Sequence, residues 1–238
     1  MSFACDTCPV RDRAACSVLD ESERQALAAA GRIRDIGRGD ILFHAGDEMT
    51  ACATLISGAL KVTSIDPDGE ERILALVHPS GFIGEMFQPF AQFDVVALTD
   101  SKLCTFSRAN MDGAIERFPS LARALLRRSQ EDLHRAHLLL QLTGKHSANE
   151  KVGSLLLAMA QAASDSPCHP AALFDLPLSR GEMANMLGLT IETVSRQLSR
   201  LEKSGIIRRE GARGIALLDP ARLRLSGIGP AVGPIVSH

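Results

Sequence analysis

One stretch near the C-terminus, LSRGEMANMLGLTIETVSRQLSRLEKSGII, constrains the fold more than any other part of the chain, because it carries the start and stop signals of two helices. Ser179 followed by Glu182 forms an S-x-x-E capping box, which begins a helix. Gly188 permits the tight turn that ends this helix, and Thr190 is a good N-cap for the next one. Residues 206–217 then alternate around two glycines, as a hairpin does. The pattern predicts a helix-turn-helix followed by a wing.

The polar face of the second helix suits contact with DNA bases. Arg196 can donate two hydrogen bonds to guanine, Glu192 can accept one from cytosine N4, and Ser195 is small enough to reach a base edge. Other polar residues are better placed to contact phosphates, which position a protein without specifying sequence. We assign this role to Arg180, Thr190, Ser199, Arg200, Arg208, Arg209 and Arg213. The alternative interpretation is a helical hairpin whose polar face is simply solvated.

Charge is unevenly distributed along the chain. Between Leu178 and Arg213 there are seven Arg or Lys residues and four Glu residues, so this segment carries +3. Because the whole chain has a formal charge of −2, the remainder carries −5. A basic C-terminal patch on an acidic body is typical of a modest nucleic-acid footprint.

The region from about residue 33 to residue 108 has a different sequence pattern. Glycines separate short apolar runs such as DILFHAG and ATLISGALKVTS, at a spacing of roughly 10–12 residues. This spacing predicts an antiparallel β-barrel or jelly roll, and together with the C-terminal helices an α+β fold. The DPDGEE stretch, residues 66–71, is expected to form a hairpin tip with Asp68-Gly69 as its turn.

A long helix is expected after the β region. Steps of three and four residues place a heptad stripe along it. The stripe consists of Leu126, Ser129, Leu133, Ala136 and Leu140. We interpret it as a dimerisation seam, weakly apolar and therefore of tunable strength, although a stripe of this kind can also pack on the barrel of its own chain.

These segments give a domain organisation of five parts. They are a cysteine-rich N-terminal arm (1–17), a β-barrel sensor domain (18–117), a dimerisation helix (118–145), a winged helix-turn-helix domain (146–225) and a flexible tail (226–238). The first residues lack an apolar h-region, and no run of about 18 apolar residues occurs. We therefore expect a cytoplasmic protein with no membrane contact.

The cysteines are clustered in a way that needs a chemical explanation. The arm contains the spacing C-x2-C-x7-C, and thiols in the cytoplasm stay reduced. Such clusters indicate metal or redox chemistry more than structural disulfides. Elsewhere, Cys52 is interpreted as a small buried strand residue and Cys168 as an incidental loop residue.

A barrel, a heptad helix and a winged helix-turn-helix, in that order, resemble the CRP/FNR family of bacterial transcription regulators. The resemblance covers essentially the whole chain, and ETVSRQLSRLEKSGII is similar to the family's recognition helix. The E-x-x-S-R pattern of Glu192, Ser195 and Arg196 resembles the FNR branch, which binds palindromes of TTGAT half-sites. The resemblance implies a homodimer that binds double-stranded DNA, and contact of the 66–71 hairpin with RNA polymerase. The sequence shows no nucleophile–base pair and no phosphate-cradling loop, so we do not expect an enzyme.

The oxygen-sensing FNR branch binds a [4Fe–4S] cluster through three N-terminal cysteines and one from the barrel. The matching residues here are Cys5, Cys8, Cys16 and Cys104, with a longer second gap than in the best-known member. The resemblance implies that cluster binding holds the arm against the barrel and favours the dimer, and that oxygen reverses this.

The chemistry is reasonable independently of the family. Four thiolates are the usual complement of a [4Fe–4S] cluster. The ligated cluster is anionic, and Arg11 and Arg13 are close enough in sequence to offset part of its charge.

Other effectors remain as alternatives. A zinc ion, disulfide formation and haem could each replace the cluster as the trigger. A cyclic nucleotide is not expected, because the segment FQPFAQFDVVALTD after Gly84-Glu85-Met86 contains no Arg or Lys to pair with a buried phosphate.

Overall fold

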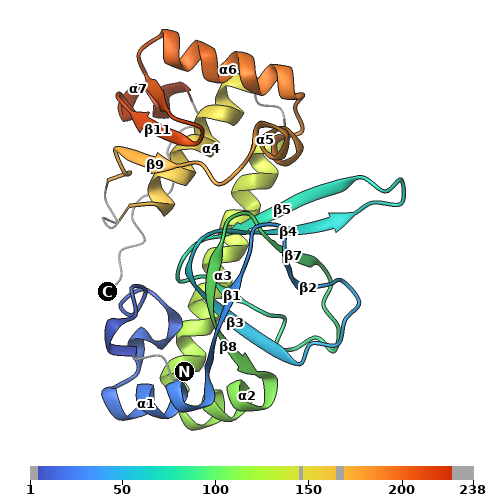
Figure 1. Ribbon diagram of the computed structural model, residues 1–238, viewed down its shortest axis with the longest axis vertical. Helices are drawn as coiled ribbons and strands as arrows, with labels where there is room; N and C mark the ends of the chain where they lie inside the picture. The colour runs from blue at the N-terminus through green and yellow to red at the C-terminus, as the bar shows by residue number, and fades with distance from the viewer. Residues whose placement is uncertain (1–4, 145–146, 165–168, 227–238) are drawn as a thin grey trace. The chain divides into compact units, whose positions relative to one another are not determined.

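The computed structural model describes residues 5–144, 147–164 and 169–226 (Figure 1). The chain divides into two compact units, Met1–Ala136 and His137–His238. Of the flexible tail predicted for residues 226–238, only the backbone of Ser226 is among the described residues. Cys168 also lies outside them.

Two four-stranded antiparallel sheets form the body of the first unit, as the glycine spacing predicts. Their strand orders are β1-β8-β3-β6 and β2-β7-β4-β5. The strands are β1 (Arg32–Ile36), β2 (Ile41–Phe43), β3 (Ala51–Ser57), β4 (Leu60–Ile65), β5 (Glu71–Val77), β6 (Phe82–Ile83), β7 (Asp94–Ala97) and β8 (Ser101–Ser107).

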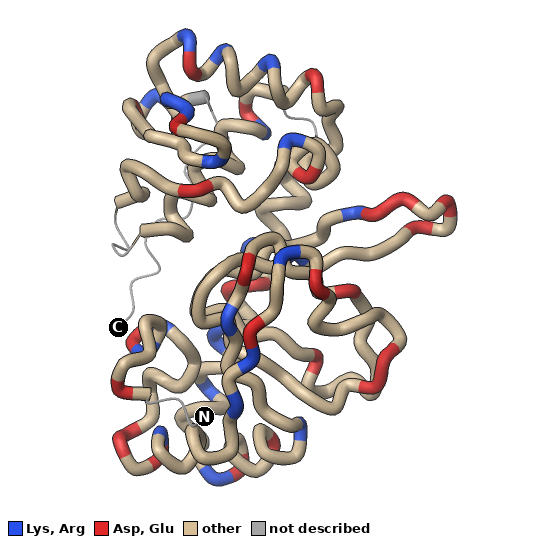
Figure 2. The backbone as a smooth tube through the Cα atoms, viewed as in Figure 1, with Lys and Arg blue, Asp and Glu red and all other residues tan. Residues whose placement is uncertain are grey.

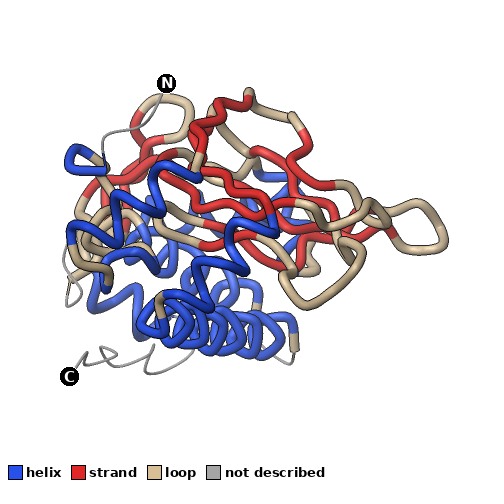
Figure 3. Tube along the Cα trace, turned by 90° about the horizontal axis from the view of Figure 1, so that it is seen from below, coloured by secondary structure: helices blue, strands red, loops and turns tan. Residues whose placement is uncertain are grey.

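The two sheets share one apolar core. Leu55 on β3 and Leu103 on β8 come from one sheet, Leu60 on β4 comes from the other, and all three are fully buried in the same cluster. Figure 3 shows the strands gathered into a single body. Strand β8 is therefore paired along both edges, with β1 and β3, and its Leu103 packs into the core.

The β4–β5 hairpin forms where the sequence predicts it. Gly69 has φ of +87°, a left-handed conformation that an L side chain rarely adopts. The Asp66 carboxylate accepts hydrogen bonds from the backbone N–H of Asp68 and of Glu70, both at 3.0 Å. These bonds close the turn, and Figure 1 shows the hairpin extending away from the two sheets.

Three helices complete the first unit. They are α1 (Glu21–Ala30), α2 (Arg108–Arg117) and α3 (Pro119–Thr143), the last continuing past the boundary between the units. Asp20 caps α1 with a full capping box, and Gly31 ends it. The sequence did not indicate α2, because only Met111 and Ala114 of that helix are buried and no apolar stripe results.

The second unit contains the predicted helix-turn-helix and wing. Its elements are α4 (Ala148–Ala162), β9 (Leu173–Asp175), α5 (Arg180–Leu187), α6 (Ile191–Lys203), β10 (Ile207–Glu210), β11 (Gly214–Leu217) and α7 (Pro220–Ser226). The Ser179–Glu182 capping box, the left-handed Gly188 at φ of +61° and the Thr190 N-cap are all confirmed.

Two elements of this unit differ from the sequence analysis. Residues 173–175, expected to belong to a loop, form β9 and pair with β11. A strand of three residues shows no alternation, and its partner is about forty positions away, so no local signal identifies it. Helix α7 was not expected, and its Leu223 is fully buried.

A buried lysine joins three helices of the second unit. Lys151 on α4 is 6% exposed, and its ammonium group donates to the backbone oxygens of Thr143 and Leu187. These carbonyls belong to the C-terminal ends of α3 and α5, where a cation is favourable. The helix-turn-helix is thus attached to the last turn of the long helix.

Among the described residues, no helix has both the length and the apolar character that crossing a bilayer demands.

Candidate cysteine cavity and nucleic-acid interface

Cys104 lies at the centre of a sheet. It is on β8, opposite Ile33 of β1 on one side and Thr54 of β3 on the other. Gly31, at the end of α1, approaches this position closely: a Cβ there would lie 3.4 Å from the Cys104 sulfur and 2.8 Å from the Phe106 ring. The backbone of Cys104 is therefore fixed by a strand on each side, and its sulfur lies close to the backbone of Gly31.

The other three predicted ligands lie on the arm. Cys5 begins the short 3-10 helix η1 (Cys5–Thr7), and the N–H of Cys8 donates to its carbonyl at 3.2 Å. Cys16 is in a second short helix, η2 (Ala15–Val18). The sequence left the path of the loop from Cys8 to Cys16 open.

That loop is a compact turn with its own apolar anchor. The N–H of Ala14 donates to the carbonyl of Val10 at 2.9 Å, so the two side chains lie on the same face. Both are 2% exposed and pack against Ile56 of β3. The segment between Cys8 and Cys16 therefore supplies the two residues, Val10 and Ala14, that pack the arm against the sheet.

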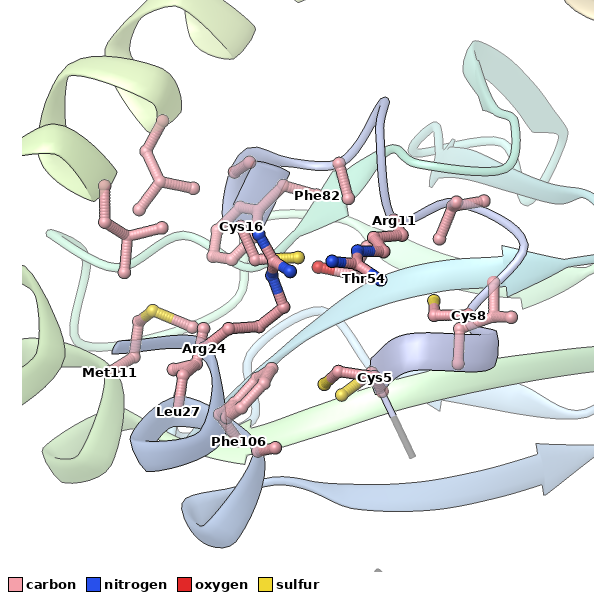
Figure 4. A pocket seen from close by; sticks show the side chains of 18 residues that line it. Cys5, Cys8, Arg11, Cys16, Arg24, Leu27, Thr54, Phe82, Phe106 and Met111 are labelled. Carbon is pink, nitrogen blue, oxygen red and sulfur yellow. The ribbon is translucent and has the colours of Figure 1, made fainter. Parts of the chain in front are cut away.

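The four cysteines line a single cavity (Figure 4). Apart from the thiols and two arginines the lining is largely apolar, including Leu27, Phe82, Phe106, Met111, Leu121 and Leu125. The structure therefore brings together residues that are separated by about ninety positions in sequence.

The thiols of the cavity affect one another. Burial, followed by the proximity of Cys5, Cys16 and Cys8, raises the pKa of Cys104 to about 12. Burial and the neighbouring thiols also raise the pKa of Cys16. Without a positive centre these groups remain protonated at neutral pH, whereas a bound metal displaces thiol protons. The donor set is suited to a cationic, sulfur-preferring group.

A single metal ion fits this arrangement less well than a larger group. Among the residues that the structure describes, no three His, Cys, Asp or Glu side chains converge closely enough to hold one ion. The thiolates around an iron–sulfur cube bind separate iron atoms, so they need not converge on a point.

Two arginines enter the cavity, and only one of them was expected. Arg11, predicted to offset cluster charge, lines the cavity. Arg13, also predicted, instead lines a groove beside α3. Arg24 on α1 was not identified, because it stands in the polar first half of its helix and a charged residue there gives no sign of burial. It is 8% exposed and lines the cavity with the cysteines.

One side chain of the long helix donates a hydrogen bond to the backbone of the arm. Arg128 on α3 donates to the carbonyl of Arg13 at 2.7 Å and pairs with Glu131 at 3.1 Å. Its side chain is 15% exposed. A hydrogen bond from a charged donor in such a position is stronger than a neutral one. The position of the arm is thus linked directly to α3.

The predicted seam is not covered by the barrel. Leu126, Leu133 and Leu140 are 63%, 58% and 69% exposed. Leu121 and Leu125, on another face of α3, pack into the core with α1 and α2 instead. Ser129 is exposed and Ala136 half-buried. This leaves a row of exposed leucines at heptad spacing, as a dimerisation helix requires.

The three predicted base-contacting residues share the exposed N-terminal half of α6. Glu192 and Arg196 are exposed and Ser195 half-buried. The backbone N–H of Glu192 and the Thr190 hydroxyl hold the pKa of the Glu192 carboxyl below its usual value, so it stays ionised as a hydrogen-bond acceptor. Figure 2 shows the Lys and Arg positions along this helix.

The predicted phosphate-contacting residues fall into two groups. Arg208 and Arg209 are already paired within the chain, with Glu210 and Glu202 respectively, at 3.1 and 2.8 Å from Nε. The second pair joins α6 to β10 and so stabilises the wing. In the other group Arg180, Thr190 and Arg200 are exposed, and Ser199 and Arg213 are half-buried. The first group has less charge available for DNA than the sequence implied.

Cys52 lies on β3 and is fully buried, as predicted, and it does not line the cysteine cavity. Burial raises its pKa to about 12.

Comparison with known proteins gives matches along most of the chain. A family model described as "Crp-like helix-turn-helix domain" matches residues 150–225, and one described as "Cyclic nucleotide-binding domain" matches residues 33–118. The chain is 35% identical over 222 residues to "Transcriptional activator protein FnrL" of Cereibacter sphaeroides, covering 92% of this chain and 90% of that relative.

Two further matches concern FixK proteins. The chain is 33% identical to "Nitrogen fixation regulation protein FixK" of Bradyrhizobium diazoefficiens, covering 92% of each chain. The solved structure of FixK2 from Bradyrhizobium japonicum superposes with a TM-score of 0.76 at 26% identity, covering 84% of this chain and 99% of that one.

Different roles are predicted for Arg196 and Arg200, the two arginines of α6 that we expect to contact DNA. We expect Arg196→Ala to cost about 1–3 kcal/mol on a palindrome of TTGAT half-sites and to relax specificity at one base pair. We expect Arg200→Ala to weaken binding to all sequences alike and to reduce the salt dependence by about one counterion per protomer. Binding isotherms at several salt concentrations, on the palindrome and on a scrambled duplex, measure both. Equal losses on both duplexes for Arg196→Ala would contradict its assignment.

Proposed function

This chain belongs to the CRP/FNR family of transcription regulators, and on that basis we propose that it is an oxygen-responsive, homodimeric activator that depends on a [4Fe–4S] cluster. It is a DNA-binding regulator and not an enzyme. In this proposal it acts in the cytoplasm, on palindromes of TTGAT half-sites. One observation supports the cluster above the others: four cysteines from two distant segments line one cavity.

The residues of the cavity fit the proposed cofactor. Cys5, Cys8 and Cys16 supply three thiolates from one docked turn, and Cys104 supplies the fourth from a central strand. Arg11 and Arg24 oppose the negative charge of four thiolates, and the apolar remainder limits access of water. When bound, a [4Fe–4S] cluster supplies an oxygen-labile link among the thiolates.

The arm then acts on the dimer through α3. With all four cysteines engaged, the turn between Cys8 and Cys16 is held against the sheet, and the Arg13 carbonyl is held in front of Arg128. Arg128 precedes seam residue Ser129 directly and lies two positions from Leu126. Holding the arm therefore orients the turn of α3 that carries the seam. Only a few kcal/mol separate the monomer and the dimer in such a switch. One charged hydrogen bond is therefore enough to change the fraction of dimer.

The acidic tip of the β4–β5 hairpin is the surface we propose for RNA polymerase. Asp66, Asp68 and Glu70 are exposed on it, and Figure 2 shows the acidic positions along the hairpin. A hairpin that extends from the sheet presents such residues without moving the DNA-binding unit. The FnrL relative is named a transcriptional activator, which is consistent with contact to polymerase.

Replacement of Asp68 tests the polymerase contact. We expect Asp68→Ala to lower transcription in vitro from a promoter with a TTGAT palindrome while leaving affinity for the same DNA unchanged, because the hairpin tip is not part of the DNA interface. Unchanged transcription at saturating protein would rule out the contact.

Two cysteines of the same sheet, Cys52 and Cys104, provide a matched test of the cluster. After oxygen-free purification we expect the wild-type protein and Cys52→Ala to contain about four iron and four sulfide per chain, and Cys104→Ala to contain clearly less. Chemical iron and sulfide analysis, before and after air exposure, is the measurement. Full loading and full anaerobic DNA binding by Cys104→Ala would eliminate Cys104 as the coupling ligand.

The same preparations distinguish the other effectors. Broad brown absorption supports the cluster, whereas a sharp Soret band indicates haem and colourless protein indicates zinc or thiols. Either of the last two results would overturn the cluster and leave the family assignment intact.

Two neighbouring arginines on α3, Arg127 and Arg128, test whether the arm influences dimerisation through Arg128. We expect Arg128→Ala to keep its iron and sulfide but to dimerise about 10-fold more weakly, equivalent to ~1.4 kcal/mol, because it loses a charged hydrogen bond to the arm. Arg127 is exposed, and Arg127→Ala is the control with unchanged dimerisation. Sedimentation under anaerobic conditions measures both. Identical dimerisation of Arg128→Ala and the wild type would show that the arm reaches the seam by another route.

A further inference from the structure

Arg24 differs from the other charged residues around the cysteine cavity in the depth of its burial. Its side chain is 9% exposed, and Figure 4 shows it directed from α1 into the space that the cysteines line. Arginine is almost never buried to this degree unless its charge and its N–H groups have partners.

The polypeptide satisfies only part of this guanidinium. One terminal nitrogen, Nη2, donates to the backbone oxygen of Leu19 at 2.6 Å, and the other, Nη1, lies 3.4 Å from the Glu21 carboxylate. Nε is equally buried and has no hydrogen-bond partner among the described residues. Two anchors therefore fix the planar group, and its Nε–H is left without a hydrogen-bond partner among the described residues.

Arg11 is not equivalent, although it lines the same cavity. Its guanidinium lies 3.8 Å from Asp6 and 3.7 Å from Glu21, and its side chain is 35% exposed. Two carboxylates and solvent thus offset its charge. Arg24 shares only Glu21, so its charge is the one left to act on the interior of the cavity.

We propose that Arg24 is a positioning residue for the iron–sulfur centre, to which its free Nε–H donates a hydrogen bond at sulfur. This inference rests on the proposed function. Hydrogen bonds to sulfur and nearby positive charge are the outer contacts by which proteins retain and tune such centres. Because Leu19 O and Glu21 fix the guanidinium before any group binds, its direction does not depend on the cluster.

Iron loss to a chelator under strictly anaerobic conditions tests this role. We expect Arg24→Gln to lose its visible absorption about 10-fold faster than the wild type, the usual scale for removing an outer contact of a metal site. Arg24→Lys keeps the charge without the Nε–H of the fork and should lose iron at an intermediate rate. Arg117 is an exposed residue of α2 that does not line the cavity, so Arg117→Gln is the control and should lose iron at the wild-type rate.

Thermal unfolding distinguishes a purely structural role of Arg24 from a contact with the cluster. Loss of the bond to Leu19 lowers the melting temperature of cluster-free and loaded protein equally, whereas loss of a cluster contact reduces the rise in melting temperature on loading. If the loaded wild type and loaded Arg24→Gln release iron at the same rate, the inference is wrong and the proposed function stands. The same holds if cluster loading raises the melting temperature of both proteins equally. If anaerobic wild type contains no iron, both fail together.

Discussion

The packing of Val10 and Ala14 against Ile56 is the contact on which the arrangement of the first unit depends. It holds a short N-terminal segment on the sheet by burying two apolar side chains, before any cofactor is considered. Three thiols of the arm thereby meet a fourth on the central strand β8. Without this contact, the proposed cofactor would have to offset more of the entropy lost when the arm is ordered.

The docked arm is connected to the two places where function is expected. On one side its backbone accepts a hydrogen bond from Arg128, next to the exposed seam of α3. On the other side α1, which follows the arm directly, carries Arg24 into the cavity. The proposed sensing site and the proposed dimer helix are therefore joined by direct contacts within one unit, and no long pathway needs to be invoked.

Local signals made much of this structure predictable. The capping residues Ser179 and Thr190 and the glycine at 188 act on their own turns, so the helix-turn-helix could be recognised from sequence. Strand β9 could not, because its pairing with β11 is distant and its length is three residues. Arg24 was missed for a related reason, since burial of a charge is decided by neighbours far along the chain. Likewise, the pairing of Arg209 with Glu202 removes a charge that the sequence alone assigns to DNA.

The composition of the seam has a consequence for the cell. Exposed leucines alternate with Ser129 and Ala136, so each heptad buries less apolar surface than a strong coiled coil does. Association of this kind follows mass action, and the paired fraction changes with the number of copies present. Under the proposed function, gene dosage becomes a second input beside oxygen, and a modest rise in synthesis favours the dimer even in partly aerated cells.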